Sequence, residues 1–451
     1  MGITLWDDMM KVNFPKDFVW GVASSSYQIE GGVNKDGRGS TIWDDFCAMP
    51  GVIADGSDGA VACDHYHRYR EDFALMQSMG IKHYRFSLAW SRLYPDGDGE
   101  LNQAGLTFYT RLLDALDEYG IEPMVTLYHW DLPSALQARG GWANRETAYA
   151  FARYAKAVFA FFGHRVRRFI THNEPWCTAY LGHGIGIHAP GIRNHAQMLD
   201  VAHHLMLSHG LAVQAYRAAG FAGEIGITLN LNQVYPETER AEDILAAERI
   251  GVFHNGWFLD PILKGSYSSL FGEVFGKMPA AIQEGDLEVI AQPIDFLGIN
   301  YYSYSVVAHD ENSAHAKTRN VTPHDRVTDM DWPILGQGLR DLLIDLHQTY
   351  GKVPLYITEN GCAQIDRLEG DRVHDISRIN YLSEHFAALS DALLQGVPLL
   401  GYYAWTFMDN FEWGYGYTKT FGLVYVDWAT QTRIPKDSAF WYAELLRSFD
   451  H

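Results

Sequence analysis

Cysteine is scarce in this chain of 451 residues, and its four copies, Cys47, Cys63, Cys177 and Cys362, are widely separated. Four such residues are too few for a disulfide framework, and their spacing lacks the CxxC pairs typical of structural zinc sites. The sequence also has no apolar run approaching the roughly 20 residues that cross a bilayer. Its first 20 residues lack the basic-then-apolar pattern of a secretory signal peptide. We therefore expect a cytoplasmic protein that does not span or bind a membrane.

Positive charge is also scarce, because 35 Lys and Arg stand against 55 Asp and Glu, for a net charge of −20. This balance argues against a nucleic-acid partner and against anionic membranes, both of which attract basic surfaces. Hydrophobic residues make up 47% of the chain and charged residues 20%, as in a globular protein. Aromatic residues reach 14%, so rings either fill a large core or line a site for a ligand with apolar faces.

One pattern recurs along the chain: an amphipathic segment, a glycine, and then a short run rich in β-formers. Residues 102–119 have apolar positions at helical spacing, Gly120 follows, and residues 122–128 come next. The strand-like runs number eight and cover residues 18–23, 81–87, 122–128, 166–171, 224–229, 295–302, 353–358 and 399–405.

Alternating strands and helices predict parallel pairing with right-handed crossovers. Eight such units over this length favour an α/β fold, a single (β/α)8 TIM barrel with long βα loops. The alternative, a doubly wound open sheet, usually carries a glycine-rich phosphate turn after its first strand, and that turn is absent here. We expect one catalytic domain over residues 1–451, with residues 1–13 as a candidate extension outside the barrel. The polar stretch 309–331 is predicted to be a long βα loop.

Polar and aromatic residues stand at or just beyond the C-terminal ends of the predicted strands. In chain order they are Gln28, Arg85, His129, Asn173, Glu174, Asn300, Tyr302, Glu359, Trp405, Glu412 and Trp413. A parallel barrel brings these ends to one mouth, so Glu174 and Glu359 would meet there although they are far apart in the sequence.

Two facing carboxyls are the usual machinery for splitting a glycosidic bond, one protonated and one ionised. Arg85, if it lies close to Glu359, would hold that group as a carboxylate. Glu174 precedes Pro175 and Trp176 in apolar surroundings and would keep its proton more easily. A lone glutamate at a strand end is more often part of a salt bridge, so the prediction rests on the convergence of several strand ends.

Four motifs give the chain a resemblance to a known family. They are residues 18–31 (FVWGVASSSYQIEG), 171–175 (THNEP), 357–361 (ITENG) and 405–413 (WTFMDNFEW). With these motifs the chain resembles glycoside hydrolase family 1, the β-glucosidase family of (β/α)8 barrels, over most of its length.

The resemblance implies a retaining β-glycosidase that hydrolyses terminal non-reducing β-D-glucosyl residues by double displacement through a covalent glycosyl-enzyme. Glu174 matches the general acid/base and Glu359 the nucleophile, with Arg85, Asn173 and Tyr302 as further catalytic-site residues. The implied sugar-binding residues are Gln28, His129, Asn173, Asn300, Tyr302, Trp405, Glu412, Trp413 and Phe421. The implied aglycone residues are Trp176, Leu181 and Trp332.

Two alternative functions are compatible with the same fold. A 6-phospho-β-glycosidase resembles this chain but carries a serine where Glu412 stands, and a carboxylate there would repel phosphate. Glu412 could instead accept from both O4 and O6 of the sugar, which predicts activity on β-galactosides and β-fucosides as well. A non-catalytic sugar-binding barrel typically loses one carboxylate, whereas both are present here.

We expect neither a metal nor a cofactor, because the histidine pairs His65/His67 and His203/His204 lack the HExxH spacing of zinc hydrolases. The expected partner is a small β-glycoside or oligosaccharide, and the sequence does not reveal an oligomeric state. His172 stands where many family members have an apolar residue, and its side chain should point away from Glu174 because strand neighbours alternate. Cys177 and Cys362 each follow a predicted catalytic glutamate by three residues and are expected to be small buried side chains.

Overall fold

The computed structural model describes residues 14–313 and 316–449. The predicted extension, residues 1–13, lies outside the described residues. The prediction that one domain spans the chain stays a prediction.

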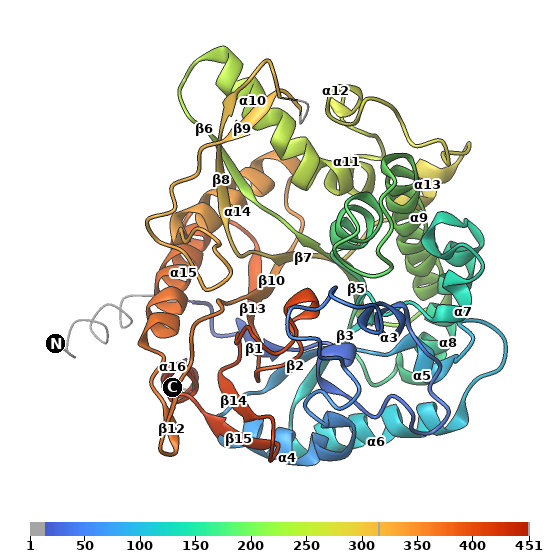
Figure 1. The fold of residues 1–451 in the computed structure, drawn as a ribbon, viewed down its shortest axis with the longest axis vertical. Helices are drawn as coiled ribbons and strands as arrows, with labels where there is room; N and C mark the ends of the chain where they lie inside the picture. The colour runs from blue at the N-terminus through green and yellow to red at the C-terminus, as the bar shows by residue number, and fades with distance from the viewer. Residues whose placement is uncertain (1–13, 314–315, 450–451) are drawn as a thin grey trace.

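Eight parallel strands close into a barrel in the order β1-β13-β10-β7-β5-β4-β3-β2 (Figure 1). The pairings of β1 with β13, Val19 opposite Gly401, and with β2, Gly21 opposite His83, close the ring. The eight are β1 (Val19–Ala23), β2 (His83–Ser87), β3 (Glu122–Tyr128), β4 (Arg168–Asn173), β5 (Glu224–Asn230), β7 (Phe296–Asn300), β10 (Leu355–Asn360) and β13 (Leu399–Trp405). The predicted (β/α)8 barrel is therefore confirmed, and no predicted strand end is displaced by more than two residues.

Helices surround the barrel and cover its outer face (Figure 1). In α6 (Gln103–Tyr119), the Asn102 side chain caps the N-terminus at Ala104 N, and Gly120 ends the helix at φ +67°, as the spacing predicts. The other long helices are α4 (His65–Ser78), α8 (Glu146–Phe162), α9 (His195–Ala219), α10 (Ala241–Gly251), α11 (Trp257–Lys264), α14 (Gly336–Tyr350), α15 (Ile376–Leu394) and α16 (Asp437–Phe449). The short helices are α2 (Ser26–Ile29), α3 (Ile42–Cys47), α5 (Trp90–Leu93), α7 (Ser134–Gln137), α12 (Phe271–Phe275) and α13 (Asp286–Ile290).

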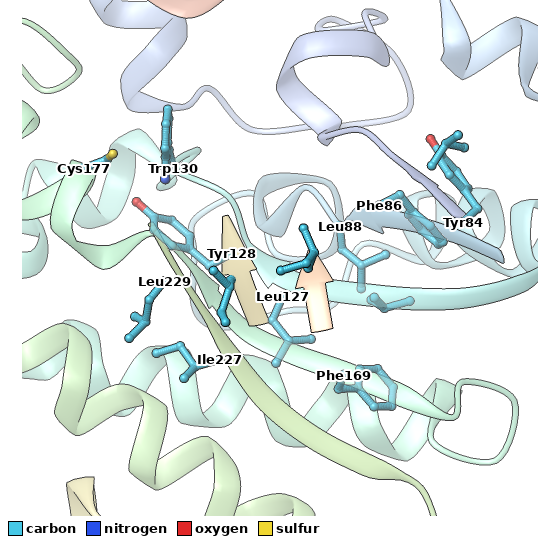
Figure 2. Packing of buried hydrophobic residues seen from close by; sticks show 14 of the residues in the cluster. Tyr84, Phe86, Leu88, Leu127, Tyr128, Trp130, Phe169, Cys177, Ile227 and Leu229 are labelled. Carbon is cyan, nitrogen blue, oxygen red and sulfur yellow. The ribbon is translucent and has the colours of Figure 1, made fainter. Parts of the chain in front are cut away.

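The hydrophobic core has two layers, one on each side of the barrel wall. The outer layer joins strands to helices, and Figure 2 shows four of its side chains, Phe86, Leu127, Phe169 and Ile227, which come from neighbouring strands. The inner layer fills the barrel with side chains from its strands, including Val19, Met124, Ile170, Phe296, Tyr356 and Tyr403. Successive strand residues alternate between the layers, so the interior below the mouth is packed and only the strand ends are free to build a site.

A small sheet of three strands stands beyond the barrel mouth, beside α10 in Figure 1. It consists of β6 (Gln233–Pro236), β8 (Tyr304–His309) and β9 (Thr318–Asn320). The stretch 309–331 is thus not all loop, as predicted, because β9 lies within it and pairs antiparallel with β8. Arg319 and Asn320 are exposed, so β9 has no apolar alternation that could reveal it.

Two hairpins complete the structure, β11 (Leu368–Glu369) with β12 (Arg372–Val373) and β14 (Val424–Asp427) with β15 (Thr432–Pro435). Across the residues that the structure describes, none of the helices combines the length and apolar character that crossing a membrane requires.

Candidate active site

The two predicted catalytic glutamates line one cavity of about 550 Å³ at the C-terminal ends of the barrel strands. Glu174 directly follows β4, and Glu359 lies near the end of β10. Both side chains are buried, with 6% and 3% of their surface exposed. The fold therefore brings together two carboxyls from opposite halves of the sequence.

Glu359 is surrounded by groups that stabilise a negative charge. Arg85 Nη1 lies 2.5 Å from its Oε1, and the Tyr302 hydroxyl donates to its Oε2 at 2.7 Å. Burial raises the pKa of Glu359 above its ordinary value, whereas the Arg85 guanidinium and the Tyr302 hydroxyl oppose that shift by stabilising the carboxylate. Of the two glutamates, Glu359 is thus the one held in the ionised form.

Glu174 lies in a different environment, with two neutral donors as its hydrogen-bonding partners. Asn300 Nδ2 donates to its Oε1 at 2.5 Å, and the Cys177 thiol lies 3.0 Å from its Oε2. Burial, and then the negative charge of Glu359, raises the pKa of Glu174 to about 7. The guanidinium beside Glu359 and the neutral donors beside Glu174 thus favour a shared proton on Glu174.

The backbone at Glu174 is held in an unusual conformation. Its φ is +48°, in the left-handed region that side chains other than glycine rarely adopt. The Glu174 amide donates to Thr228 O of β5, and the Cys177 amide donates back to Glu174 O, each at 2.9 Å. These two bonds fix a sharp turn at the end of β4, as is common where strain is stored at a functional site.

A hydrogen-bond network joins the two glutamates beneath the cavity. Arg85, which contacts Glu359, also donates from Nη2 to Asn173 Oδ1 at 2.6 Å. Asn300 Nδ2 donates both to Asn173 Oδ1, at 3.0 Å, and to Glu174. The remaining Asn173 amide group points at His129 Nε2, 3.1 Å away. Moving any of these side chains would therefore alter the hydrogen bonds of both carboxyls.

The predicted sugar-binding aromatics gather around the same cavity. His129 lies parallel to both Trp405 and Trp413, with ring centroids 5.9 Å apart in each pair. Burial and then the charge of Arg85 hold the pKa of His129 well below its ordinary value, so its ring is neutral. Phe421 and Tyr302 also line the cavity, and their rings meet edge to face with centroids 6.1 Å apart. Such flat walls suit the C–H faces of a sugar ring.

Two further carboxyls, those of Asp331 and Glu412, line the cavity. Glu412 is partly buried, and burial, followed by the charges of Glu359 and Glu174, raises its pKa to about 8. Near neutral pH this group is therefore largely protonated and can donate as well as accept a hydrogen bond.

Gln28 differs from the other predicted sugar-binding residues, because it does not line this cavity. Its amide nitrogen donates to Asn410 Oδ1 and to Phe411 O, and its oxygen accepts from Ser25. Gln28 therefore supports the segment that carries Glu412, and its contact with a sugar stays a prediction.

The cavity lining includes further apolar and polar residues. Trp176, Leu181 and Trp332, the predicted aglycone residues, all line the cavity. Sequence reasoning missed a set of polar lining residues, Asn230, Asn232, Ser303, Ser305, Asn320, Thr322 and His324. Several of these lie in or next to the small sheet β6–β8–β9, so no local sequence signal could place them at the cavity.

Other predicted features also have definite places. His172 is fully buried, bonds through Nε2 to Ser208 Oγ at 2.8 Å and packs on Phe151, which confirms its predicted packing role. His65 and His203 pair with carboxylates, at Asp72 and Asp286. Among the described residues, no three or more His, Cys, Asp or Glu side chains are grouped so as to hold a metal ion.

Comparison with known proteins points to one family. The family model described as glycosyl hydrolase family 1 matches residues 10–450. "Beta-glucosidase A" of Acetivibrio thermocellus is 46% identical over 445 residues, which cover 98% of this chain and 99% of the relative. A crystal structure of the AHE enzyme from Alicyclobacillus herbarius is 50% identical, with a TM-score of 0.94 and 97% and 98% of the two chains covered. The family 1 glycoside hydrolase of Thermotoga maritima, solved with a cyclophellitol analogue as a transition state mimic, is 45% identical, with a TM-score of 0.93 and 97% and 98% covered.

Proposed function

The chain belongs to glycosyl hydrolase family 1, and from this membership we propose that it is a retaining β-glucosidase. It releases terminal, non-reducing β-D-glucosyl residues from a small glycoside. The observation that carries the proposal is a single cavity holding two buried glutamates, one against a guanidinium and one whose pKa is raised to about 7. The names of the relatives, which are β-glucosidases, support it.

In the first step Glu359 attacks the anomeric carbon while Glu174 donates its proton to the departing glycosidic oxygen. The carbon–oxygen bond to the aglycone breaks, and an ester to Glu359 forms. The contacts of Arg85 and Tyr302 with Glu359 support its ionised form beforehand, and Asn173, which lines the cavity, would hydrogen-bond the sugar beside the reacting carbon.

In the second step Glu174 acts as a base. Once Glu359 is an ester it has no charge, so one of the two effects that raise the pKa of Glu174 disappears. Glu174 then takes a proton from water, the water oxygen attacks the anomeric carbon, and Glu359 leaves as a carboxylate. Two displacements at the same carbon retain the β configuration.

The mixed lining of the cavity supports a broad choice of leaving group. Trp176, Leu181 and Trp332 offer apolar contact to aryl or alkyl aglycones, and the polar lining residues offer hydrogen bonds to a second glucose. We therefore propose that cellobiose and aryl β-glucosides are both substrates.

Glu412 supports a further choice at the terminal sugar. Because a carboxyl that is largely protonated near neutral pH can both accept and donate a hydrogen bond, it suits hydroxyls in more than one configuration. We expect the enzyme to hydrolyse p-nitrophenyl β-galactoside and β-fucoside in addition to the glucoside. The expectation fails if both are inert. We also expect 6-phospho-β-glucosides to stay unreacted above about pH 8, where Glu412 is mostly ionised and repels a phosphate.

The decisive experiment compares Glu174→Gln with Glu359→Gln on two substrates. On cellobiose, whose leaving group needs a proton, both variants should be slower, Glu174→Gln by about 10²–10⁴-fold. On dinitrophenyl β-glucoside, whose leaving group needs none, Glu174→Gln should still form the glycosyl-enzyme rapidly, whereas Glu359→Gln should lose about 10⁴-fold or more.

Two further readouts complete the test. Azide should rescue Glu174→Gln by giving β-glucosyl azide, and NMR should find β-glucose as the first product of the wild type. Equal losses of the two variants on both substrates, or α-glucose as first product, would contradict the proposal.

We also propose that the protein works in the cytoplasm, with its cysteines as free thiols. The support is that all four cysteines are unpaired and three of them are buried. Thiol labelling of the protein under denaturing conditions, directly after cell lysis, should modify all four.

A further inference from the structure

The thiol of Cys177 contacts the carboxyl of Glu174 inside the cavity. Its Sγ lies 3.0 Å from Glu174 Oε2, and the residue lines the cavity at the start of a π-helical turn, Cys177–Gly184. We propose that Cys177 is a positioning residue whose thiol donates a hydrogen bond to Glu174, orients that carboxyl and sets how readily it releases its proton. The inference rests on the proposed function of Glu174 as acid and base.

The two oxygens of Glu174 each have one protein donor. Asn300 Nδ2 serves Oε1 and the thiol serves Oε2. Burial, followed by the charge of Glu174, raises the pKa of Cys177 well above its ordinary value, so it remains a thiol with a proton to donate. A thiol is a weak donor, and it stabilises a carboxylate less than a hydroxyl or an amide would. Glu174 must hold a proton in one step and release it in the next. A weak donor lowers the pKa of its carboxyl only slightly, so the proton can still be held.

The turn after β4, not the spacing in the sequence, creates this contact. Cys362 stands three residues after Glu359, just as Cys177 stands three after Glu174, and it is also buried. Its Sγ accepts from Gln364 Nε2 at 3.5 Å and has no bond to Glu359. Only Glu174 combines the left-handed φ with the bond from the Cys177 amide that folds the third residue back over the carboxyl. Cys362 is therefore a matched control.

The experiment follows the basic limb of the kcat/KM profile on a glucoside with a poor leaving group. Cys177→Val fills the space without a donor and should move that limb up by about 0.5–1 pH unit, because the carboxylate loses one hydrogen bond. Cys177→Ser keeps a donor and should return the limb to the wild-type position or below it. Cys362→Val and Cys362→Ser should leave the limb unchanged. A packing role alone would leave the limb unshifted in Cys177→Val, because valine fills the same space, and that result would overturn the proposal.

A second measurement separates this proposal from the proposed function. In the inactive Glu359→Gln background, ¹³C NMR of labelled glutamate carboxyls can titrate Glu174 with Cys177 intact and with Cys177→Val added. A higher pKa in the valine variant supports the thiol contact even if the wild type proves not to be a glucosidase, and equal values overturn it. In the intact wild type, the infrared S–H stretch should contain a component that moves to lower frequency as Glu174 ionises. A band that does not respond to pH would contradict the hydrogen bond without relying on any variant.

Discussion

Glu174 and Glu359 carry the same chemical group, and their neighbours make them differ. Arg85 contacts Glu359 directly, whereas Glu174 receives only neutral donors and feels the negative charge of its partner. In a buried site these effects are large because little water screens them. The division of labour between acid and nucleophile is therefore a property of the neighbours.

The pH dependence of activity should report Glu174. With its pKa raised to about 7, the proton needed by the leaving group is lost as the pH rises through that value. We expect kcat/KM for cellobiose to fall tenfold per pH unit above about pH 8. Glu174→Gln, measured on dinitrophenyl β-glucoside, should show no such limb. A limb that persists in this variant would assign the titration to another group.

Glu412 should make stability depend on pH. Its pKa is about 8 in the folded protein against an ordinary value of 4.5. Between these values the folded state binds the proton more tightly than the unfolded state does, so stability falls as the pH rises through this window. Glu412→Gln cannot lose a proton, and it should melt about 1–3 °C above the wild type at pH 9 and close to it at pH 4.

Thermal melts at the two pH values check this expectation. Glu369→Gln, at an exposed site in β11 outside the cavity lining, is the matched control. Its melting temperature should differ from that of the wild type by the same amount at both pH values. A constant difference between Glu412→Gln and the wild type across the range would contradict the expectation.

At the scale of elements, the site depends on how closely neighbouring strand ends approach. Gly361 directly follows the strand that carries Glu359, and a Cβ there would lie 1.8 Å from Trp405 O at the end of β13. Only the missing side chain lets these two ends approach so closely. The same contact sets the separation between the nucleophile and the Trp405 ring.

Gly361→Ala should therefore damage both stability and activity. We expect a loss of about 1–3 kcal/mol in the free energy of unfolding, and about 10²-fold in kcat/KM if Glu359 moves by about 1 Å. Gly272→Ala, in α12, meets nothing within 4 Å and should change neither by much. Urea titration and steady-state kinetics test both variants, and unchanged kinetics in Gly361→Ala would show that the strand ends can separate freely.

At the scale of the whole molecule, a buried ion network joins the last third of the chain to the site. Lys436 Nζ lies 2.5 Å from Asp366 and 2.7 Å from Asp409, and all three side chains are essentially unexposed. Asp409 also accepts from Gly422 N, next to the cavity residue Phe421. The network thus ties the start of α16 to the segment that closes the cavity.

Lys436→Met should leave the buried Asp409 without its cation, whereas Asp366 keeps its ion pair with Arg378. Breaking such a pair typically costs about 3–5 kcal/mol. Arg372→Met removes an exposed pair with Asp437 and should cost less than about 1 kcal/mol. Urea titration compares them, and similar losses in the two variants would mean that the buried charges find other partners or water. KM for the glucoside should rise in Lys436→Met alone, because only that change loosens the cavity wall.

The sequence by itself determined the eight barrel strands and the two glutamates of this protein. Glycine ends helices and β-branched or aromatic residues favour strands through local sterics, so the eight strands could be predicted to within two residues. The motifs around Glu174 and Glu359 are equally local, and a parallel barrel brings strand ends together whatever its loops contain.

Only the tertiary structure decided the contacts between elements and the charges that follow from them. The strand β9, the polar lining residues of the cavity and the thiol contact of Cys177 depend on pairing and turns that leave no local pattern. The pKa of Glu174 depends on its burial and on its distance from Glu359, and both come into existence only when the barrel closes.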